Sequence, residues 1–600
     1  MKGIAIGLSN NSKEILKRLK KTEFVKDIYI AGSSKEDGKE NELIQVQKPR
    51  EILLKKWPKI DLIIFIGSIA ASIRIINPFL TSKDQDPGVI VIDNKCSKIV
   101  PLIGLHQSNT QNISCQIANL LGGEIIETNN SNDQSLLNLD AFGNQWGWKR
   151  SGKINDWSKL VIKQAKNEEI FCKQLSGNSL WKNSESAEII NQIDKKETEK
   201  PDSTFHVSIF ENHGTTWHPP VLWIGIGCER NTSKELIANS LNNLLESGNL
   251  SQQSIAGFAT IDIKKDEKGI LELSEEKNLP IKFFSKKDLS TIIVPNPSNV
   301  VQKEIGTPSV AEASCLLAAG EESKLLEEKR IFKNQSGAVT IAVAESKNQY
   351  NPTHGEIHII GSGPGDISFL TNNARKALSR CTVWIGYKMY LDLIKPLKRN
   401  DQVLIESKLT EEKERCSKAI KLAEEGIKVA LISSGESGFY GMAGLLLELL
   451  QKIKKEYRPY FEVHPGISSV QLAAAISGAP LMNDFCSVSL SDKLTPWPLI
   501  EKRIKGALMG DFVIALFNPQ SIERNWQLKS VIDICLQSRH GDTPVLLARQ
   551  VGRENQTKKF FTLNTIPFKE IDMLSIIIIG NSQTTLVDEI FLTPRGYLQN

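Results

Sequence analysis

The stretch Ile-Ile-Gly-Ser-Gly-Pro-Gly-Asp at residues 359–366 most constrains how this chain can fold. A short apolar strand enters a glycine-rich turn, and apolar residues then recur at helical spacing. Gly361, Gly363 and Gly365 carry no β-carbon, so backbone N–H groups can approach a ligand closely. Pro364 removes one donor that a pyrophosphate would use, which favours a less highly charged ligand than a dinucleotide. A plain connection between a strand and a helix has the same pattern.

Length and composition predict a multidomain globular protein. At 600 residues the chain has room for roughly three to five domains. The 74 basic and 69 acidic residues leave a net charge of +5, too small to indicate a nucleic-acid partner. No apolar run reaches the ~18 residues that a membrane span needs, so we expect no membrane segment.

The cysteines and the N-terminus indicate a cytoplasmic protein. The nine cysteines are scattered without a CxxC motif or a Cys/His cluster, so we expect neither a metal site nor a disulfide framework. The first residues, Met-Lys-Gly-Ile-Ala-Ile-Gly-Leu, run directly into a predicted strand and do not resemble a signal peptide.

The first half of the chain predicts small α/β domains. In residues 1–124, the apolar segments 2–8 and 61–67 have the pattern of buried parallel strands. The helix predicted next carries Arg74. His106 lies in a later loop, where a lone histidine is usually a surface or capping residue, although its ordinary pKa suits a general base.

A polar region separates this domain from a second one. Residues 125–219 are rich in Asn, Ser and Lys and have weak apolar periodicity, which predicts a variable middle region with linkers. Residues 220–345 again alternate strands and helices. Arg230 follows the first strand, where its guanidinium would suit a carboxylate or phosphate, or simply occupy a turn. Glu312 lies within a predicted helix of small residues at 310–319.

Residues 346–355 are expected to form a polar linker to the final unit, 356–600. In that unit, four more loops follow apolar strands. These strand-and-loop segments are residues 429–444, 461–470, 484–497 and 512–519. Loops at the carboxyl ends of strands in an α/β sheet converge on one crevice, so these loops predict a ligand site.

Separated motifs of residues 356–585 resemble the tetrapyrrole (corrin and porphyrin) methyltransferases. They are Tyr-Gly-Met-Ala-Gly (440–444), Ser-Leu-Ser-Asp-Lys-Leu-Thr-Pro-Trp (489–497), Phe-Asn-Pro (517–519) and Ile-Ile-Gly-Asn-Ser (578–582). Within that family they are similar to the precorrin-3B C17-methyltransferases, which contract the ring. The resemblance implies two α/β domains with S-adenosylmethionine in the cleft between them.

The resemblance also implies which residues line the cofactor. By family position these are Pro364, Ser434, Gly435, Glu436, Phe439, Ser468, Ser469 and Leu516. Glu436 stands where the family commonly has Asp, so its contact differs by one methylene. A sulfonium beside a zwitterion suits backbone carbonyls, hydroxyls and one carboxylate better than a basic cluster.

Methyl transfer to an electron-rich ring carbon requires the methyl donor and that carbon to be correctly oriented. It requires no side-chain nucleophile, because the macrocycle itself is the nucleophile. Asp492, Lys493 and Thr495 are candidates to face the substrate's carboxylates or ring lactone. A solvated turn would explain the same three residues.

Motifs of the N-terminal half resemble the cobalt-precorrin-5A hydrolases of cobalamin biosynthesis. They are Asp-Gln-Asp-Pro-Gly-Val-Ile-Val-Ile-Asp (84–93), Gly-Ile-Gly-Cys-Glu-Arg-Asn-Thr-Ser (225–233) and Gly-Thr-Pro-Ser-Val-Ala-Glu-Ala (306–313). Lactone opening needs a base and an oxyanion site, for which His106 and Glu312 are candidate bases. Arg74 and Arg230 are candidates to hold substrate carboxylates. The family's Gly-His-Leu-Gly-Gly-Ala-Asn loop is replaced here by Gly-Leu-His-Gln-Ser-Asn-Thr at 104–110, so the resemblance does not by itself imply the family's loop shape or the activity that depends on it.

Other functions fit parts of the same pattern. The methyltransferase fold also serves RNA- and protein-modifying relatives, and the N-terminal half could hold a corrinoid without catalysis. A pyridine-nucleotide oxidoreductase fits less well because of Pro364. The resemblance implies a tetrapyrrole substrate, a homodimer and other cobalamin-pathway enzymes as partners.

Overall fold

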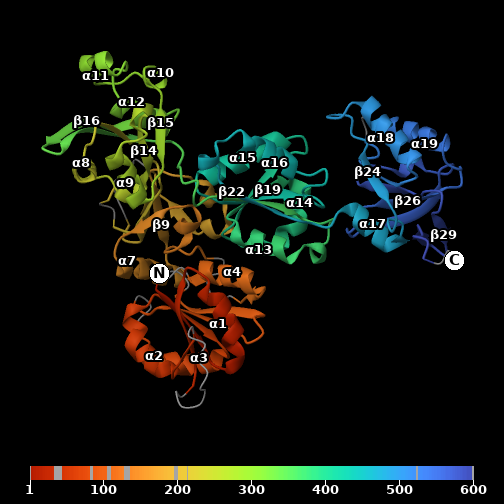
Figure 1. Ribbon diagram of the computed structural model, residues 1–600, viewed down its shortest axis with the longest axis horizontal. Coiled ribbons are helices and arrows are strands. Elements are labelled where there is room, and N and C mark those ends of the chain that lie inside the picture. The colour runs from red at the N-terminus through yellow and green to blue at the C-terminus, as the bar shows by residue number, and fades with distance from the viewer. Residues whose placement is uncertain are drawn as a thin grey trace. The chain divides into compact units, whose positions relative to one another are not determined.

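The computed structural model describes residues 2–32, 44–81, 85–104, 110–126, 136–194, 197, 201–211, 214–521 and 524–597. The chain divides into two compact units, each built from α/β sheets (Figure 1). The first unit comprises Met1–Gln134, Asn138–Ala141 and Lys153–Ile162, and the second comprises the other residues. The predicted α/β fold class is confirmed.

A seven-stranded sheet forms the first unit, in the order β3-β2-β1-β4-β5-β6-β7. The two predicted strands are β1 and β4, which pair in parallel and are buried along their whole length. Apolar cores on both faces of the sheet explain their continuous apolar sequences. The strands are β1 (Gly3–Gly7), β2 (Val25–Ile30), β3 (Gln45–Val46), β4 (Leu62–Ile66), β5 (Gly88–Ile92), β6 (Lys98–Ile103) and β7 (Glu124–Ile125), and the helices are α1 (Lys13–Lys20), α2 (Pro49–Lys56), α3 (Ile69–Ile76) and α4 (Thr110–Leu121).

The middle region is more ordered than the sequence predicts. Five strands form a sheet in the order β10-β9-β11-β12-β8. Its core is aromatic: the ring of Phe142 lies 5.1 Å from Trp181, 5.7 Å from Phe205 and 5.7 Å from Trp217. A few large rings thus supply this core, which explains why the aliphatic periodicity of the sequence is weak here, while the linkers expected within 125–219 stay a prediction. The elements are α6 (Phe142–Gln145), β8 (Lys149–Ser151), α7 (Ile154–Ala165), β9 (Ile170–Gln174), β10 (Ile190–Gln192), β11 (Thr204–Val207) and β12 (Thr216–His218).

The next sheet of the second unit has the order β15-β14-β13-β17-β16. β13 pairs in parallel with β14 and antiparallel with β17. Ser233 caps the predicted helix after β13, since its side chain accepts a hydrogen bond from the Leu236 N–H. The elements are β13 (Leu222–Cys228), α8 (Lys234–Ser247), β14 (Ile255–Ile261), α9 (Lys268–Lys277), β15 (Ile281–Phe284), α10 (Lys286–Leu289), α11 (Asn299–Glu304), α12 (Ala311–Ala319), β16 (Lys324–Asn334) and β17 (Gly337–Glu345).

A wholly parallel sheet follows, in the order β20-β19-β21-β18-β22. The helix after the first glycine-rich turn begins at Asn372. Residues Ile367–Phe369 form a 3-10 turn, and the Thr371 hydroxyl caps the helix by accepting from the Ala374 N–H. The elements are β18 (Glu356–Gly361), α13 (Asn372–Arg380), β19 (Val383–Tyr387), α14 (Lys388–Ile394), β20 (Val403–Ser407), α15 (Glu412–Glu424), β21 (Lys428–Ser433), α16 (Ala443–Gln451) and β22 (Tyr460–His464).

The last sheet is mixed, with the order β24-β25-β28-β26-β27, and only β24 and β25 pair in parallel. A small three-stranded sheet lies beside the C-terminal end of α17. The elements are α17 (Ser469–Ser477), β23 (Gly478–Ala479), β24 (Phe485–Ser489), α18 (Trp497–Met509), β25 (Val513–Phe517), α19 (Gln527–Leu536), β26 (Pro544–Arg549), β27 (Thr557–Thr562), β28 (Ser575–Ile579), β29 (Thr585–Val587) and β30 (Ile590–Leu592).

The predicted linker 346–355 is packed rather than free. Gln349 is only 2% exposed. Its side-chain amide donates to the carbonyls of Trp146 and Glu425 and accepts from the Trp148 indole N–H at 2.8 Å. The segment was predicted to be a linker because it is polar. The sequence does not distinguish a polar side chain exposed in a loop from one that is buried and fully hydrogen-bonded.

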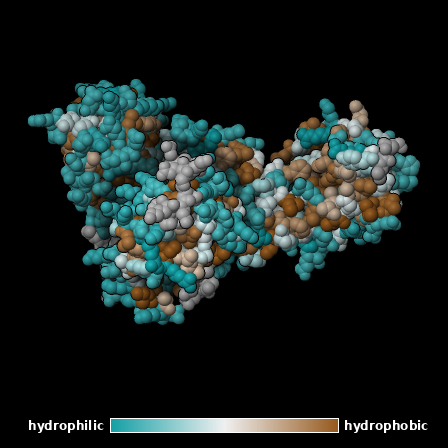
Figure 2. Space-filling view, turned by 60° about the horizontal axis from the view of Figure 1, so that its bottom comes forward, coloured by the Kyte–Doolittle hydropathy of each residue, from teal (hydrophilic) through white to brown (hydrophobic). Residues whose placement is uncertain are grey.

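Hydrophobic side chains reach the surface in several places, notably over the C-terminal part of the chain, drawn at the right in Figure 2. Leu494, Met509, Val587 and Ile590 are among the exposed apolar residues there. Within the described residues, no helix combines the length and apolar character needed to cross a membrane.

Candidate active site

Three glycine-containing loops meet at the carboxyl ends of the parallel sheet. They follow β18, β21 and β22, which are neighbours in the sheet. Gly363 and Gly435 exchange two backbone hydrogen bonds, with N···O distances of 3.1 and 2.9 Å. Both residues have positive φ, +73° and +63°, which glycine adopts without strain.

The third loop fits against the other two with no space for a side chain. A β-carbon on Gly466 would lie 2.0 Å from the Gly435 carbonyl oxygen and 2.6 Å from that of Gly361. The loops therefore form a cradle of closely packed backbone. This arrangement explains why glycine occurs at these positions, and it leaves a mostly uncharged backbone surface.

Most of the predicted cofactor residues lie on these loops. Pro364 is on the first loop, Ser434 to Phe439 are on the second, and Ser468 and Ser469 are on the third. Ser468 begins α17 with a capping box, in which its side chain accepts from the Gln471 N–H and Gln471 accepts from the Ser468 N–H.

Leu516 differs from the other predicted cofactor residues. It lies in the middle of β25 and is fully buried in the core of the last sheet. Only its backbone could therefore face a ligand.

Glu436 turns back onto its own loop. Its Oε2 accepts a 2.7 Å hydrogen bond from the Gly438 N–H. The longer side chain of Glu, compared with the family's Asp, thus serves the loop itself in this structure, and the second carboxylate oxygen is the one left for a ligand.

An aromatic cluster connects the second loop to the last sheet. The ring centroids of Phe439 and Phe517 are 5.1 Å apart, and Tyr440 lies 5.3 Å from Phe517. The Tyr440 hydroxyl also donates to the Ser487 carbonyl at 3.0 Å. These contacts hold the loop after β21 against the ends of β24 and β25.

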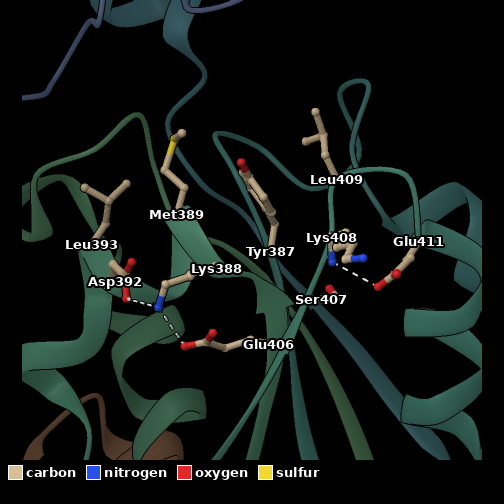
Figure 3. Close-up of a pocket in the computed structure, with 10 residues that line it drawn as sticks. All are labelled: Tyr387, Lys388, Met389, Asp392, Leu393, Glu406, Ser407, Lys408, Leu409 and Glu411. Carbon is tan, nitrogen blue, oxygen red and sulfur yellow. Dashed lines mark hydrogen bonds and ion pairs between the residues drawn. The ribbon is translucent and has the colours of Figure 1, made fainter.

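An open cavity of about 880 Å³ lies beyond the carboxyl ends of β19 and β20 (Figure 3). Tyr387, Met389, Leu393 and Leu409 give it apolar walls. Its charged residues pair with one another: Lys388 Nζ lies 3.0 Å from Glu406 and 3.7 Å from Asp392. The hydrogen bond with Glu406 raises the pKa of Lys388, so this amine stays protonated.

Residues beside the cavity contact the loops that carry the predicted cofactor residues. The Tyr390 hydroxyl shares a hydrogen bond with Ser434, and burial raises the pKa of this tyrosine. Arg553 contacts the Met389 sulfur at 3.1 Å and the Pro364 carbonyl at 3.5 Å. This wall of the cavity was not predicted from the sequence. The rule that strand ends carry the site, applied to the strand ending at Tyr387, would have found it.

The candidate substrate residues lie on the turn before α18. Asp492 accepts a 2.9 Å hydrogen bond from the Gln527 side chain, so one carboxylate oxygen is already engaged. Lys493 is exposed and Thr495 is half-buried. The structure does not bring these residues into the lining of the cavity.

The candidates of the N-terminal half have mainly structural contacts. Glu312 is fully buried, and it accepts hydrogen bonds from Asn296 at 3.0 Å and from the Lys329 N–H at 3.2 Å. Arg230 pairs with Asp266 at 2.6 Å, which raises the pKa of its guanidinium. Arg74 is exposed on α3, in the first unit. His106 lies outside the described residues.

These contacts weaken two predictions. A general base needs access to water, and Glu312 has no exposed surface here. A substrate carboxylate would have to compete with Asp266 for Arg230.

Three protein-family models match the chain. Residues 356–567 match the tetrapyrrole (corrin/porphyrin) methylases, residues 222–344 the cobalamin synthesis G C-terminus, and residues 51–132 the cobalamin synthesis G N-terminal domain.

The similar proteins fall into two groups, methyltransferases and a hydrolase. A probable cobalt-factor III C(17)-methyltransferase of Salmonella typhimurium is 44% identical over 40% of this chain and 99% of its own length. A cobalt-factor III methyltransferase of Priestia megaterium is also 44% identical, but the chain spans only 45% of its length. A cobalt-precorrin-5A hydrolase of Priestia megaterium is 27% identical over 56% of this chain and 93% of its own length. The chain belongs to the tetrapyrrole methylase family and carries this methylase behind segments that match cobalamin synthesis G domains.

Proposed function

We propose that the chain is an S-adenosylmethionine-dependent C-methyltransferase that methylates C17 of precorrin-3B or cobalt-factor III and contracts the corrin ring. The observation that carries the proposal is the meeting of three glycine loops beside an open, apolar-walled cavity. The full-length match to a methyltransferase of that substrate class supports it.

The loops fit S-adenosylmethionine, which supplies a methyl group on a sulfonium when bound. Close-packed backbone, the hydroxyls of Ser434, Ser468 and Ser469, and the free oxygen of Glu436 offer acceptors for its amine and ribose. No lysine or arginine lies on the second loop, so the surface suits a ligand without phosphates.

The cavity would hold the tetrapyrrole. Tyr387, Met389, Leu393 and Leu409 offer flat apolar contact to a conjugated ring, and Lys408 is placed to meet a ring carboxylate. Because the ring carbon is itself the nucleophile, the protein's task is to hold it in line with the methyl group.

The decisive experiment incubates the full-length protein with S-adenosylmethionine and either cobalt-factor III or precorrin-3B. Mass spectrometry should show one added methyl group, and S-adenosylhomocysteine should appear in equal amount. Methylation of RNA or protein, with no change to either tetrapyrrole, would support the family's other substrate classes and contradict this proposal.

A second activity belongs to the N-terminal half. Its two cobalamin synthesis G segments and its hydrolase relative support opening of the ring-A lactone of cobalt-precorrin-5A. Acetaldehyde release from that substrate tests it. Tight corrinoid binding without acetaldehyde release would instead support a holding role, an alternative that rests on the replaced loop sequence at 104–110 and on the burial of Glu312.

Dimer formation is a further part of the proposal. The hairpin of β29 and β30 exposes Val587 (62%) and Ile590 (56%), which a second copy could cover. Light scattering after size exclusion should give twice the mass of the chain.

A further inference from the structure

Two histidines and a glutamate meet at the edge of the parallel sheet. His358 of β18 and His464 of β22 lie with Nδ1 and Nε2 only 2.9 Å apart. Glu462 Oε2 is 3.9 Å from each of these nitrogens. His358 is paired with Glu462 in the strand register, and His464 is two residues further along β22, so the three side chains share one face of the sheet. Among the described residues, this is the cluster whose ligand atoms could converge on a metal.

The spacing suits a small divalent ion. With bonds of about 2.1 Å, tetrahedral ligand atoms are separated by roughly 3.4 Å. The three separations of 2.9, 3.9 and 3.9 Å bracket that value. Shifts of a few tenths of an ångström, with loss of the hydrogen bond between the two rings, would admit the ion.

A carboxylate already fixes the tautomer of His358. Its Nε2 donates to Glu356 Oε2 at 2.9 Å, because a carboxylate can only accept. The Nδ1 lone pair is thereby directed toward His464 and Glu462. Glu356 is in turn held by Lys428 at 3.1 Å and by Arg380. A carboxylate behind a ligating imidazole is the arrangement that orients histidine ligands in metal proteins.

Burial and access also fit. The side chains of His358 and His464 are 3% and 7% exposed, whereas Glu462 is 49% exposed and opens the cluster to solvent. β22 is an edge strand, so an ion can enter without strand separation.

We propose that His358, His464 and Glu462 bind a borderline first-row divalent cation of the zinc or cobalt(II) type, with water in the open fourth position. This site was missed in the sequence because its histidines are 106 positions apart. The inference does not depend on the proposed methyl transfer. It has a consequence for the fold: His464 immediately precedes the third glycine loop, so a bound ion would anchor that loop.

The test uses the full-length protein, stripped of metal with a chelator. Co²⁺ is titrated while visible absorption is recorded, and Zn²⁺ is titrated by calorimetry. The variants are His358→Gln, His464→Gln and Glu462→Gln. The matched control is His540→Gln, whose ring is 83% exposed beside Asp542.

We expect wild type and His540→Gln each to bind one more ion per chain than His358→Gln or His464→Gln does. The visible absorption of tetrahedral Co²⁺ should appear only in wild type and His540→Gln. Glu462→Gln should weaken binding about 10- to 100-fold. Its half-exposed position should preserve the fold if a histidine variant unfolds.

Equal stoichiometry and affinity in wild type and Glu462→Gln would overturn the proposal, as would an absence of binding by wild type. Either result would leave the two histidines as a buried pair that satisfies its own hydrogen bond.

Discussion

Single atoms decide how closely the three glycine loops approach one another. At Gly466 the missing β-carbon is what permits contact with the Gly435 and Gly361 carbonyls.

At Glu356, burial by itself would raise the pKa of the carboxyl group. The hydrogen bond from His358 and the charges of Lys428 and Arg380 outweigh burial and hold that pKa well below its ordinary value.

Gly466→Ala should weaken S-adenosylmethionine binding by at least about tenfold, because the new methyl group must push the Gly435 carbonyl away. Gly444→Ala is the matched control: it lies in α16 with no atom within 4 Å of the added carbon. The control should keep affinity and gain up to about 1 kcal/mol in stability. Calorimetric titration checks both, and equal affinity in the two variants would contradict the cradle.

Glu356→Gln should change the pH dependence of stability. The folded pKa of Glu356 lies well below its unfolded value of 4.5, so the ionised carboxylate stabilises the protein fully above that pH, and this contribution is lost progressively as the pH falls from 4.5 towards the folded pKa. The variant should be less stable than wild type at about pH 7, and the difference should be smaller, though still present, at about pH 3. Urea unfolding at the two pH values measures this. A constant difference between variant and wild type would refute the assignment.

At the scale of elements, the loops that follow parallel strands lie at one edge of the sheet. This convergence could be predicted from the sequence. Strands β1 and β4 were predicted close to their observed bounds because buried parallel strands are continuous apolar runs. Helix α13 begins only at Asn372, after a 3-10 turn, because Thr371 caps it. The strand that ends at Tyr387 can be recognised in the sequence, but which strands are neighbours in the sheet cannot, and the cluster at His464 depends on that strand order.

One buried arginine fixes the far wall of the cavity. Arg415 of α15 is 5% exposed; it donates to the Ser407 hydroxyl at 2.7 Å and to the Lys408 carbonyl at 2.8 Å. Arg415→Lys should lose this forked contact, because an ammonium is a point donor. We expect KM for the tetrapyrrole to rise about tenfold, equivalent to about 1.4 kcal/mol, with little change in S-adenosylmethionine affinity.

Steady-state kinetics and a direct binding measurement separate these two effects. Lys418→Gln, an exposed change on the same helix, serves as the control. If cofactor affinity falls as much as substrate affinity, Arg415 supports the whole sheet edge rather than the cavity wall.

At the scale of the whole molecule, the second unit is joined by buried polar contacts as well as by chain connectivity. Gln349 links the middle sheet to the parallel sheet. Near it, Gln145 donates to Asp401 at 2.8 Å, and Lys398 pairs with Glu185 at 3.1 Å. Such contacts make unfolding of the two sheets cooperative, because loss of one leaves buried groups of the other without partners.

Gln349→Ala should lower the stability of the second unit by about 3 kcal/mol and split its thermal transition into two. Asn348→Ala, at the exposed neighbouring position, should leave a single transition. Differential scanning calorimetry distinguishes them. An unchanged single transition in Gln349→Ala would show that other contacts suffice to couple the sheets.

The close packing of residues 346–355 around Gln349 affects how readily a protease can cleave the protein there. A protease that attacks flexible connectors should spare residues 346–355, although their composition resembles a favoured cleavage site. A truncated chain beginning at Glu356 would lose the glutamine that covers the Glu425 carbonyl, and it should be poorly soluble. We therefore expect the methylase portion of this chain to depend on residues 346–355, as well as on its own core, for correct folding.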